Sequence, residues 1–134
     1  MEVTIRAKDI NIPFKRSGRR LGMSGTFLED LVSKAFKKAG YVVFTRQNHC
    51  DVLAVKPDMS LAYLVECKDY VLSRKQQILA VRELNRNYTH ALELLIRQRL
   101  FPEKILKVLV AKGFAYQARG ILQYTPETFI KHIS

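Results

Sequence analysis

The sequence predicts an α/β fold, because segments with helical spacing of apolar residues alternate with short apolar runs of strand length. The order is helix, three strands, helix, two strands, helix, which predicts helices packed in layers on a central sheet. In chain order the segments cover residues 24–39, 41–45, 52–55, 61–65, 74–99, 105–111, 121–124 and 127–133.

Composition and charge limit the class of protein. The 134 residues are 48% hydrophobic and 26% charged, which is typical of one soluble domain with its own core. The formal net charge of +11 favours a polyanionic partner and leaves DNA, RNA and an anionic membrane surface open. The sequence has no run of about 18 apolar residues that would span a bilayer, and no signal-peptide core. We therefore expect a cytoplasmic protein that does not enter the membrane.

The first 24 residues are basic. Four cations fall within six residues, separated only by serine and glycine, and they are Lys15, Arg16, Arg19 and Arg20. Such a segment is typical of a flexible arm that grips phosphates. A solvated tail without contacts is the alternative, and the sequence leaves both open.

The first helix is predicted over residues 24–39, with Ser24 as N-cap and Gly40 at its C-terminal end. Glu29 flanks the apolar stripe of this helix, so it either points along the sheet or only favours the helix dipole in the first turn. The strand over residues 41–45 then leads to Arg46, which we expect to contact phosphate.

A hairpin with charged ends follows. Pro57 and Asp58 form its turn, and a turn centred after Asp58 pairs residues whose numbers add to 117. Asp51 then lies opposite Glu66 on the same face as Lys68, while Cys67 points to the other face. Two adjacent carboxylates need a cation, and Mg²⁺ prefers such oxygen ligands.

The two cysteines, Cys50 and Cys67, also have numbers that add to 117. We therefore expect them to be cross-strand neighbours on the face away from the carboxylates. Buried free thiols are the ordinary state in a reducing compartment, with a disulfide as the alternative. His49, directly before them, is expected to be a surface histidine rather than a general acid.

The second helix is predicted from Ser73 as N-cap to residue 99, with a possible interruption at residues 85–87. Its apolar stripe consists of Ile78, Val81, Tyr88, Leu92 and Leu95. Its first turn is polar and lies close to the hairpin, so we expect contacts with phosphates there, which are those of DNA if the resemblance described below holds. The candidates are Arg74, Lys75 and Gln77. For Gln77, an exposed helix surface is the alternative.

The pattern of Asp51 followed by Glu66-Cys67-Lys68 on adjacent apolar strands resembles the PD-(D/E)XK nuclease superfamily. Within it the chain is most similar to the archaeal Holliday junction resolvases, because Gly25-Thr26-Phe27-Leu28-Glu29 matches their opening helix and residues 121–126 match their closing strand. The resemblance implies a restriction endonuclease-like fold, a mixed central sheet of about five strands flanked by helices. It also implies one nuclease domain, with a basic arm at 1–24 and a core at 25–134.

The resemblance further implies a metal-dependent DNA endonuclease that hydrolyses phosphodiester bonds. Asp51, Glu66 and the carbonyl of Cys67 would hold Mg²⁺, with Mn²⁺ as a substitute. Lys68 would position the attacking water or help to deprotonate it, and Glu29 would complete the site directly or through water. The expected partner is DNA, branched if the resolvase likeness holds, and the expected assembly is a homodimer that serves recombination or repair. A restriction- or repair-type nuclease on duplex DNA and a non-catalytic nucleic-acid-binding module remain the alternatives.

Overall fold

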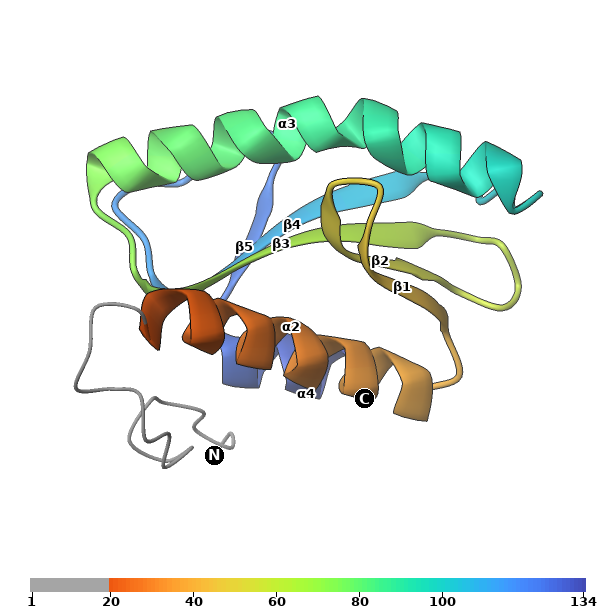
Figure 1. The fold of residues 1–134 in the computed structure, drawn as a ribbon, viewed down its shortest axis with the longest axis horizontal. Helices are drawn as coiled ribbons and strands as arrows, with labels where there is room; N and C mark the ends of the chain where they lie inside the picture. The colour runs from red at the N-terminus through yellow and green to blue at the C-terminus, as the bar shows by residue number, and fades with distance from the viewer. Residues whose placement is uncertain (1–19) are drawn as a thin grey trace.

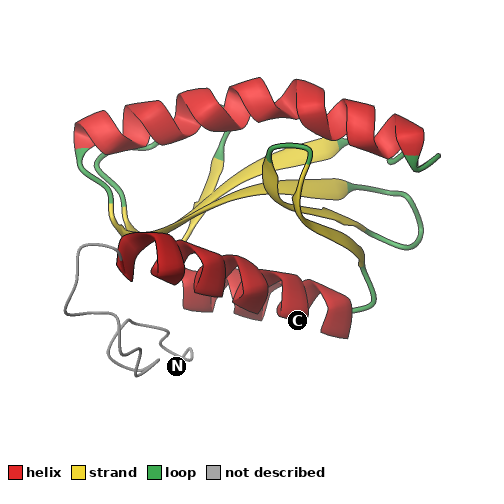
Figure 2. Cartoon of the chain, in the orientation of Figure 1, coloured by secondary structure: helices red, strands yellow, loops and turns green. Residues whose placement is uncertain are grey.

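The computed structural model describes the backbone of residues 20–134 and the side chains from residue 26 onward. A five-stranded sheet lies between one long helix on one face and two helices on the other (Figures 1 and 2). The basic residues Lys15, Arg16 and Arg19 lie outside the described residues, and Arg20 is described only as the first backbone position of a helix. The elements, in chain order, are α2 (Arg20–Lys38), β1 (Val42–Gln47), β2 (Cys50–Val55), β3 (Ala62–Val71), α3 (Arg74–Arg97), β4 (Ile105–Gly113), β5 (Leu122–Tyr124) and α4 (Pro126–Ile133).

The sheet is mixed, with the strand order β1-β2-β3-β4-β5. β1, β2 and β3 pair antiparallel, whereas β3, β4 and β5 pair parallel. The parallel crossover from β3 to β4 runs through α3, which spans the sheet (Figure 1). The predicted class, element order and strand number are confirmed.

The predicted register of the β2–β3 hairpin is also confirmed. All the paired residues, from Val52 with Val65 to Val55 with Ala62, have numbers that add to 117. The N–H of Met59 donates to the carbonyl of Lys56 at 2.9 Å and closes the turn. The pairing stops at Val52 and Val65, so the charged residues next to them on each strand lie just beyond the ladder.

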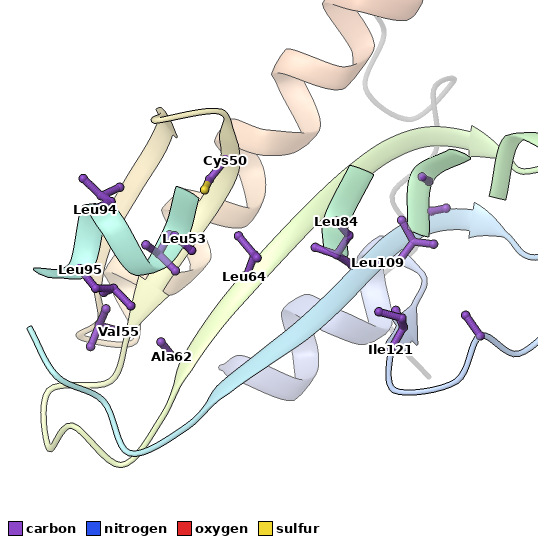
Figure 3. Packing of buried hydrophobic residues seen from close by; sticks show 14 of the residues in the cluster. Cys50, Leu53, Val55, Ala62, Leu64, Leu84, Leu94, Leu95, Leu109 and Ile121 are labelled. Atoms are coloured by element: carbon purple, nitrogen blue, oxygen red, sulfur yellow. The ribbon is translucent and has the colours of Figure 1, made fainter. Parts of the chain in front are cut away.

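Both faces of the sheet are covered by apolar side chains. On the α3 face, Leu84 of the helix packs with Leu64 and Leu109 of the sheet (Figure 3). On the opposite face, Phe36 of α2 and Phe129 of α4 belong to a second buried cluster, which includes Val52, Val65 and Val108 of the sheet. Burial on both faces explains the nearly continuous apolar runs of β2, β3 and β4.

Two helix predictions need correction. α2 begins at Arg20, so Ser24 lies inside the helix and is not its N-cap. α3 is capped by Ser73 as predicted, but it is continuous from Arg74 to Arg97. The predicted stripe is confirmed only in part: Leu95 is buried, and Val81 and Tyr88 pack half-buried against the core. Ile78 and Leu92 are 39% and 38% exposed. The buried face includes two polar residues, Gln77 and Asn87, which a search for apolar spacing passes over.

The expected placement of the cysteines is also wrong. Both thiols are free and buried, but Cys50 belongs to the cluster on the α3 face and Cys67 to the cluster on the opposite face. Arg46, Asn48 and His49 all have positive φ angles. They twist this end of the β1–β2 hairpin, so the alternation that holds from Val52 onward does not extend to Cys50.

Within residues 20–134, none of the helices has both the length and the apolar character that crossing a membrane requires.

Candidate active site

The site is built around Glu66 and Lys68 on β3. Their side chains project to the α3 face, and the ammonium of Lys68 lies 3.3 Å from Oε2 of Glu66. Glu66 is only 2% exposed, because β3 is a central strand covered by α3. The predicted sharing of one face by these two residues is confirmed.

Asp51 reaches the same strand from the end of β2. Its Oδ2 accepts a hydrogen bond of 2.9 Å from the backbone N–H of Cys67. Because the β2–β3 pairing ends at Val52, this N–H is satisfied by the Asp51 side chain instead of a backbone carbonyl. The carboxylate is thereby fixed beside the residue between Glu66 and Lys68.

Burial makes the carboxylates costly to ionise. It raises the pKa of Glu66 to about 9, with a further contribution from the charge of Asp51. Burial also raises the pKa of Asp51, although the Cys67 N–H and Lys68 oppose that shift. For Lys68 itself burial lowers the pKa, but Glu66 and then Glu83 outweigh it, so the net pKa is raised. The ammonium therefore stays charged near neutral pH, next to carboxyl groups that burial makes hard to ionise.

Glu29 enters from α2 on the opposite side. Its side chain is 12% exposed, and Arg46 Nη1 lies 3.0 Å from its Oε1. Burial and then the Asp51 charge raise the pKa of Glu29 to about 7, with Arg46 acting in the other direction. Arg46 also pairs with Asp30 at 2.9 Å. The structure thus brings Glu29 into electrostatic contact with Asp51.

Glu83 of α3 is a site residue that the sequence analysis missed. Its Oε1 lies 3.5 Å from the ammonium of Lys68, and its charge raises the pKa of both Asp51 and Glu66. The lengths of strand and helix on either side of Ser73 predict that Glu83 lies near Lys68. Lys68 precedes Ser73 by roughly 16 Å of strand and Glu83 follows it by roughly 15 Å of helix, so a helix that doubles back over its strand brings the two together.

The donors suit a hard divalent ion with few protein ligands. Within residues 20–134, no group of three or more His, Cys, Asp or Glu side chains has an arrangement that could hold a metal ion. Asp51 at the start of β2 and Glu66 within β3 offer carboxylate oxygens from two adjacent strands, and Mg²⁺ typically uses one or two carboxylates with water. Burial is the main cause of both raised pKa values, and a cation there would offset the negative charge of neighbouring carboxylates, which adds to them. The residues therefore fit Mg²⁺ as a two-carboxylate site.

The residues expected to bind DNA have different surroundings. Arg46 is held by Glu29 and Asp30. Arg74 lies with its guanidinium 5.1 Å from the centre of the Tyr116 ring, and Lys75 is exposed.

Gln77 was expected to face DNA or to lie on an exposed helix surface, and both expectations are wrong. Its side chain is 0% exposed. Its Nε2 donates to the carbonyl of Tyr116 at 2.7 Å, and its Oε1 accepts from the N–H of Ala115 at 2.7 Å. Gln77 therefore joins α3 to the loop after β4, because that loop has backbone groups that need partners in the core.

The turn between β1 and β2 is fastened to α3. Asn48 Nδ2 donates to the carbonyl of His90 at 2.6 Å, and the rings of His49 and His90 lie 4.4 Å apart. His49 is exposed, as expected for a surface histidine. Asn48 was not singled out from the sequence, although asparagine is among the residues that tolerate positive φ. This contact holds the turn that precedes Asp51.

Comparison with known proteins adds a family to this geometry. A family model described as "Restriction endonuclease" matches residues 20–94. That match spans α2, the β1–β2–β3 meander and most of α3, and it includes all the site residues named above from Glu29 to Glu83. Neither the curated proteins nor the solved structures gave a significant match. Since the matched segment is more than half of the 134 residues, the chain belongs to the restriction endonuclease family, whose members are nucleases.

Proposed function

We propose that the protein is a metal-dependent DNA endonuclease that hydrolyses phosphodiester bonds at the site formed by Asp51, Glu66 and Lys68. The observation that carries the proposal is the buried Glu66 carboxylate, 2% exposed, with the Lys68 ammonium 3.3 Å away and Asp51 fixed on the intervening residue. A cluster of this kind opposes folding unless a cation is bound to it, and ionisable groups with such perturbed pKa values are typical of functional sites. The formal net charge of +11 supports a polyanionic substrate.

Asp51, Glu66 and the carbonyl of Cys67 would hold Mg²⁺, or Mn²⁺ in its place. In an extended strand the N–H and C=O of one residue point to the same side, and the N–H of Cys67 points at Asp51. Its carbonyl therefore faces the same end of the ladder. The bound ion would act as a Lewis acid on the phosphoryl group and on water.

Lys68 acts as a cation in this proposal. Its pKa is raised by Glu66 and Glu83 against the effect of burial, so it carries a proton at neutral pH. A charged ammonium orients the attacking water and offsets the negative charge that develops on the phosphate. Glu29, whose pKa of about 7 lies near neutrality, completes the site from α2.

Duplex DNA is the first substrate to test, because the family match is to restriction endonucleases. Branched DNA is the second candidate. Two observations on Glu29 favour it. Glu29 follows Gly25 on the opening helix with the spacing seen in junction resolvases, and its pKa is raised by burial and then by the charge of Asp51. We further propose a single nuclease domain over 1–134, with residues 1–24 as a phosphate-gripping arm. A homodimer would cut both strands symmetrically.

The test is cleavage of a labelled linear duplex and of a four-way junction of matched sequence, each in Mg²⁺ and in EDTA. Equal cutting of both substrates supports a duplex nuclease, and preference for the junction supports a resolvase. In either case the Glu66→Ala variant is expected to bind DNA and not to cut it. Binding without cutting by the wild type, in Mn²⁺ as well, would replace the proposal with a non-catalytic binding module.

A further inference from the structure

Glu83 stands where α3 crosses the Glu66–Lys68 pair. The ammonium of Lys68 lies 3.3 Å from Glu66 Oε2 on its own strand and 3.5 Å from Glu83 Oε1 on the helix. The Glu83 side chain is 40% exposed, so it lies at the rim of the site and not in the core. Lys68 is thus held between two carboxylates that belong to different elements.

The backbone beneath Glu83 is firmly placed. Ala80 and Leu84, on either side of it along the helix, are buried against the sheet. Ser73 and Gln76 form a capping box at the start of α3, and Gln77 is tied to the loop after β4. These contacts fix the rotation of the helix, and they present Glu83 to Lys68 without any contribution from the ion pair itself.

The ion pair between Glu83 and Lys68 adds little to the stability of the fold. An ion pair at 3.5 Å with one partner 40% exposed contributes weakly. At the same time the charge of Glu83 raises the pKa of Asp51 and of Glu66, which means that it makes two buried carboxylates harder to ionise. A neutral side chain of the same size would relieve that repulsion. A purely structural role therefore does not account for a glutamate at this position.

We propose that Glu83 is a positioning residue that keeps the Lys68 ammonium in the site when the charge of Glu66 is engaged elsewhere. The inference rests on the proposed function, in which Glu66 is a metal ligand. A lysine side chain has four rotatable bonds, so an ammonium that loses its near carboxylate leaves the site unless a second carboxylate retains it. Glu83 is the second carboxylate in ion-pair contact with Lys68 among the described residues, and it belongs to an element that does not hold the ion.

The first test needs neither metal nor activity, because Glu66→Gln leaves a side chain that cannot form an ion pair with Lys68 at any pH. Acetic anhydride acylates the neutral amine, so the labelling rate of a lysine rises when its side chain leaves a carboxylate that holds its proton and becomes accessible. Mass spectrometry reports the labelling of Lys68 relative to the exposed Lys131. In the Glu66→Gln background, Glu83→Gln is expected to raise the relative labelling of Lys68 about two- to fivefold, the range that one partly exposed ion pair supports. The matched control is Glu93→Gln on the same helix, whose side chain is 60% exposed and contacts His90. Equal labelling of Lys68 with and without Glu83 would overturn the proposal.

The second test separates positioning from binding. In the otherwise wild-type protein, Glu83→Gln is expected to lower kcat about tenfold, as a misplaced catalytic group does, without raising KM for DNA. Glu93→Gln should leave both constants unchanged. Unchanged kcat in Glu83→Gln, while Glu66→Gln is inactive, would overturn the proposal alone. A wild-type protein that cuts no DNA would count against the proposed function, and the labelling result would then decide whether Glu83 anchors Lys68.

Discussion

The Oδ2 of Asp51 accepts a hydrogen bond from the backbone N–H of Cys67 at 2.9 Å. This bond replaces the next rung of the β2–β3 ladder, which ends at Val52 and Val65. It places a carboxylate beside Glu66 and Lys68 by a backbone contact that does not depend on a metal. The candidate site thus lies where the β2–β3 pairing ends, because the backbone N–H of Cys67 there bonds to the Asp51 side chain and not to a backbone carbonyl.

Asp51→Asn separates this structural contact from the proposed chemistry. Asparagine keeps an oxygen that accepts from the Cys67 N–H but loses the carboxylate charge. We expect the melting temperature to stay the same or rise, because the buried negative charge is gone. Cleavage in Mg²⁺ should fall by more than about 100-fold. Loss of a residue that only hydrogen-bonds to a metal ligand costs up to about that much, and Asp51 is proposed as a ligand itself. Cleavage near the wild-type rate would remove Asp51 from the site.

Glu66 predicts a pH-dependent stability in EDTA. The pKa of its carboxyl is about 9 in the folded protein against an ordinary value of 4.5. Between these two values the folded state binds more protons than the unfolded chain, so the free energy of unfolding falls as the pH rises from about 4.5 through about 9. Glu66→Gln removes this loss. Its melting temperature should exceed that of the wild type by a margin that grows from pH 5 to pH 9. A constant margin would contradict the burial argument.

Lys68→Met is expected to abolish cleavage while changing stability in the opposite direction to Glu66→Gln. The methionine removes the ammonium that lies 3.3 Å from Glu66, so the melting temperature at pH 8 should fall slightly. Thermal unfolding and cleavage of the same preparations check both statements. If the two variants lost equal amounts of stability, the pair would be a structural ion cluster.

Arg46→Gln tests how Glu29 takes part. Arg46 lowers the pKa of Glu29 against the larger effects of burial and Asp51. Its loss should therefore raise that pKa further, and the acidic limb of the rate–pH profile in Mg²⁺ should move to higher pH. In the Glu29→Gln background the same substitution should cause no shift. An unchanged limb in Arg46→Gln would show that ionisation of Glu29 does not limit the rate.

Gln77→Leu is expected to affect the fold and not DNA binding. The substitution leaves the N–H groups of Ala115 and Tyr116 without the Gln77 Oε1 acceptor, which costs about 1–3 kcal/mol of stability, while the carbonyl of Tyr116 keeps its hydrogen bond from Gln123 Nε2. Denaturant unfolding measures this loss, and the affinity for duplex DNA in EDTA should equal that of the wild type. Lys75→Gln, on the exposed face of the same turn, is the positive control, because Lys75 is expected to contact DNA and its loss should weaken binding without changing stability. A weaker affinity in Gln77→Leu without loss of stability would restore the interpretation of Gln77 as a DNA contact.

The sequence predicted the hairpin and its register because both depend on neighbouring residues. Apolar runs covered on both faces identify β2 and β3, and the turn at Pro57 and Asp58 fixes which residues pair. The carboxylate of Asp51 could therefore be placed next to Glu66 before the structure was known. The helix caps at Ser73 and Gly40 are similarly local features, and both predictions are confirmed.

Tertiary contacts were the part that the sequence did not yield. Gln77 is buried because the loop after β4 needs hydrogen-bond partners, and nothing near Gln77 in the sequence indicates this. Cys50 turns to the α3 face because the positive φ of Arg46 twists its hairpin, which alternation alone does not predict. Glu83 required an estimate of how far α3 doubles back over β3. In each case the missing information is the packing of segments distant in sequence.

Hydrolysis of a labelled linear DNA duplex in Mg²⁺, by the wild type and by Glu66→Gln side by side, tests the central claim most directly. We expect the wild type to cut in Mg²⁺ and not in EDTA, and a Glu66→Gln protein that is folded, binds DNA and is at least as stable not to cut. Equal cutting by both proteins would show that the buried carboxylate has no part in the reaction.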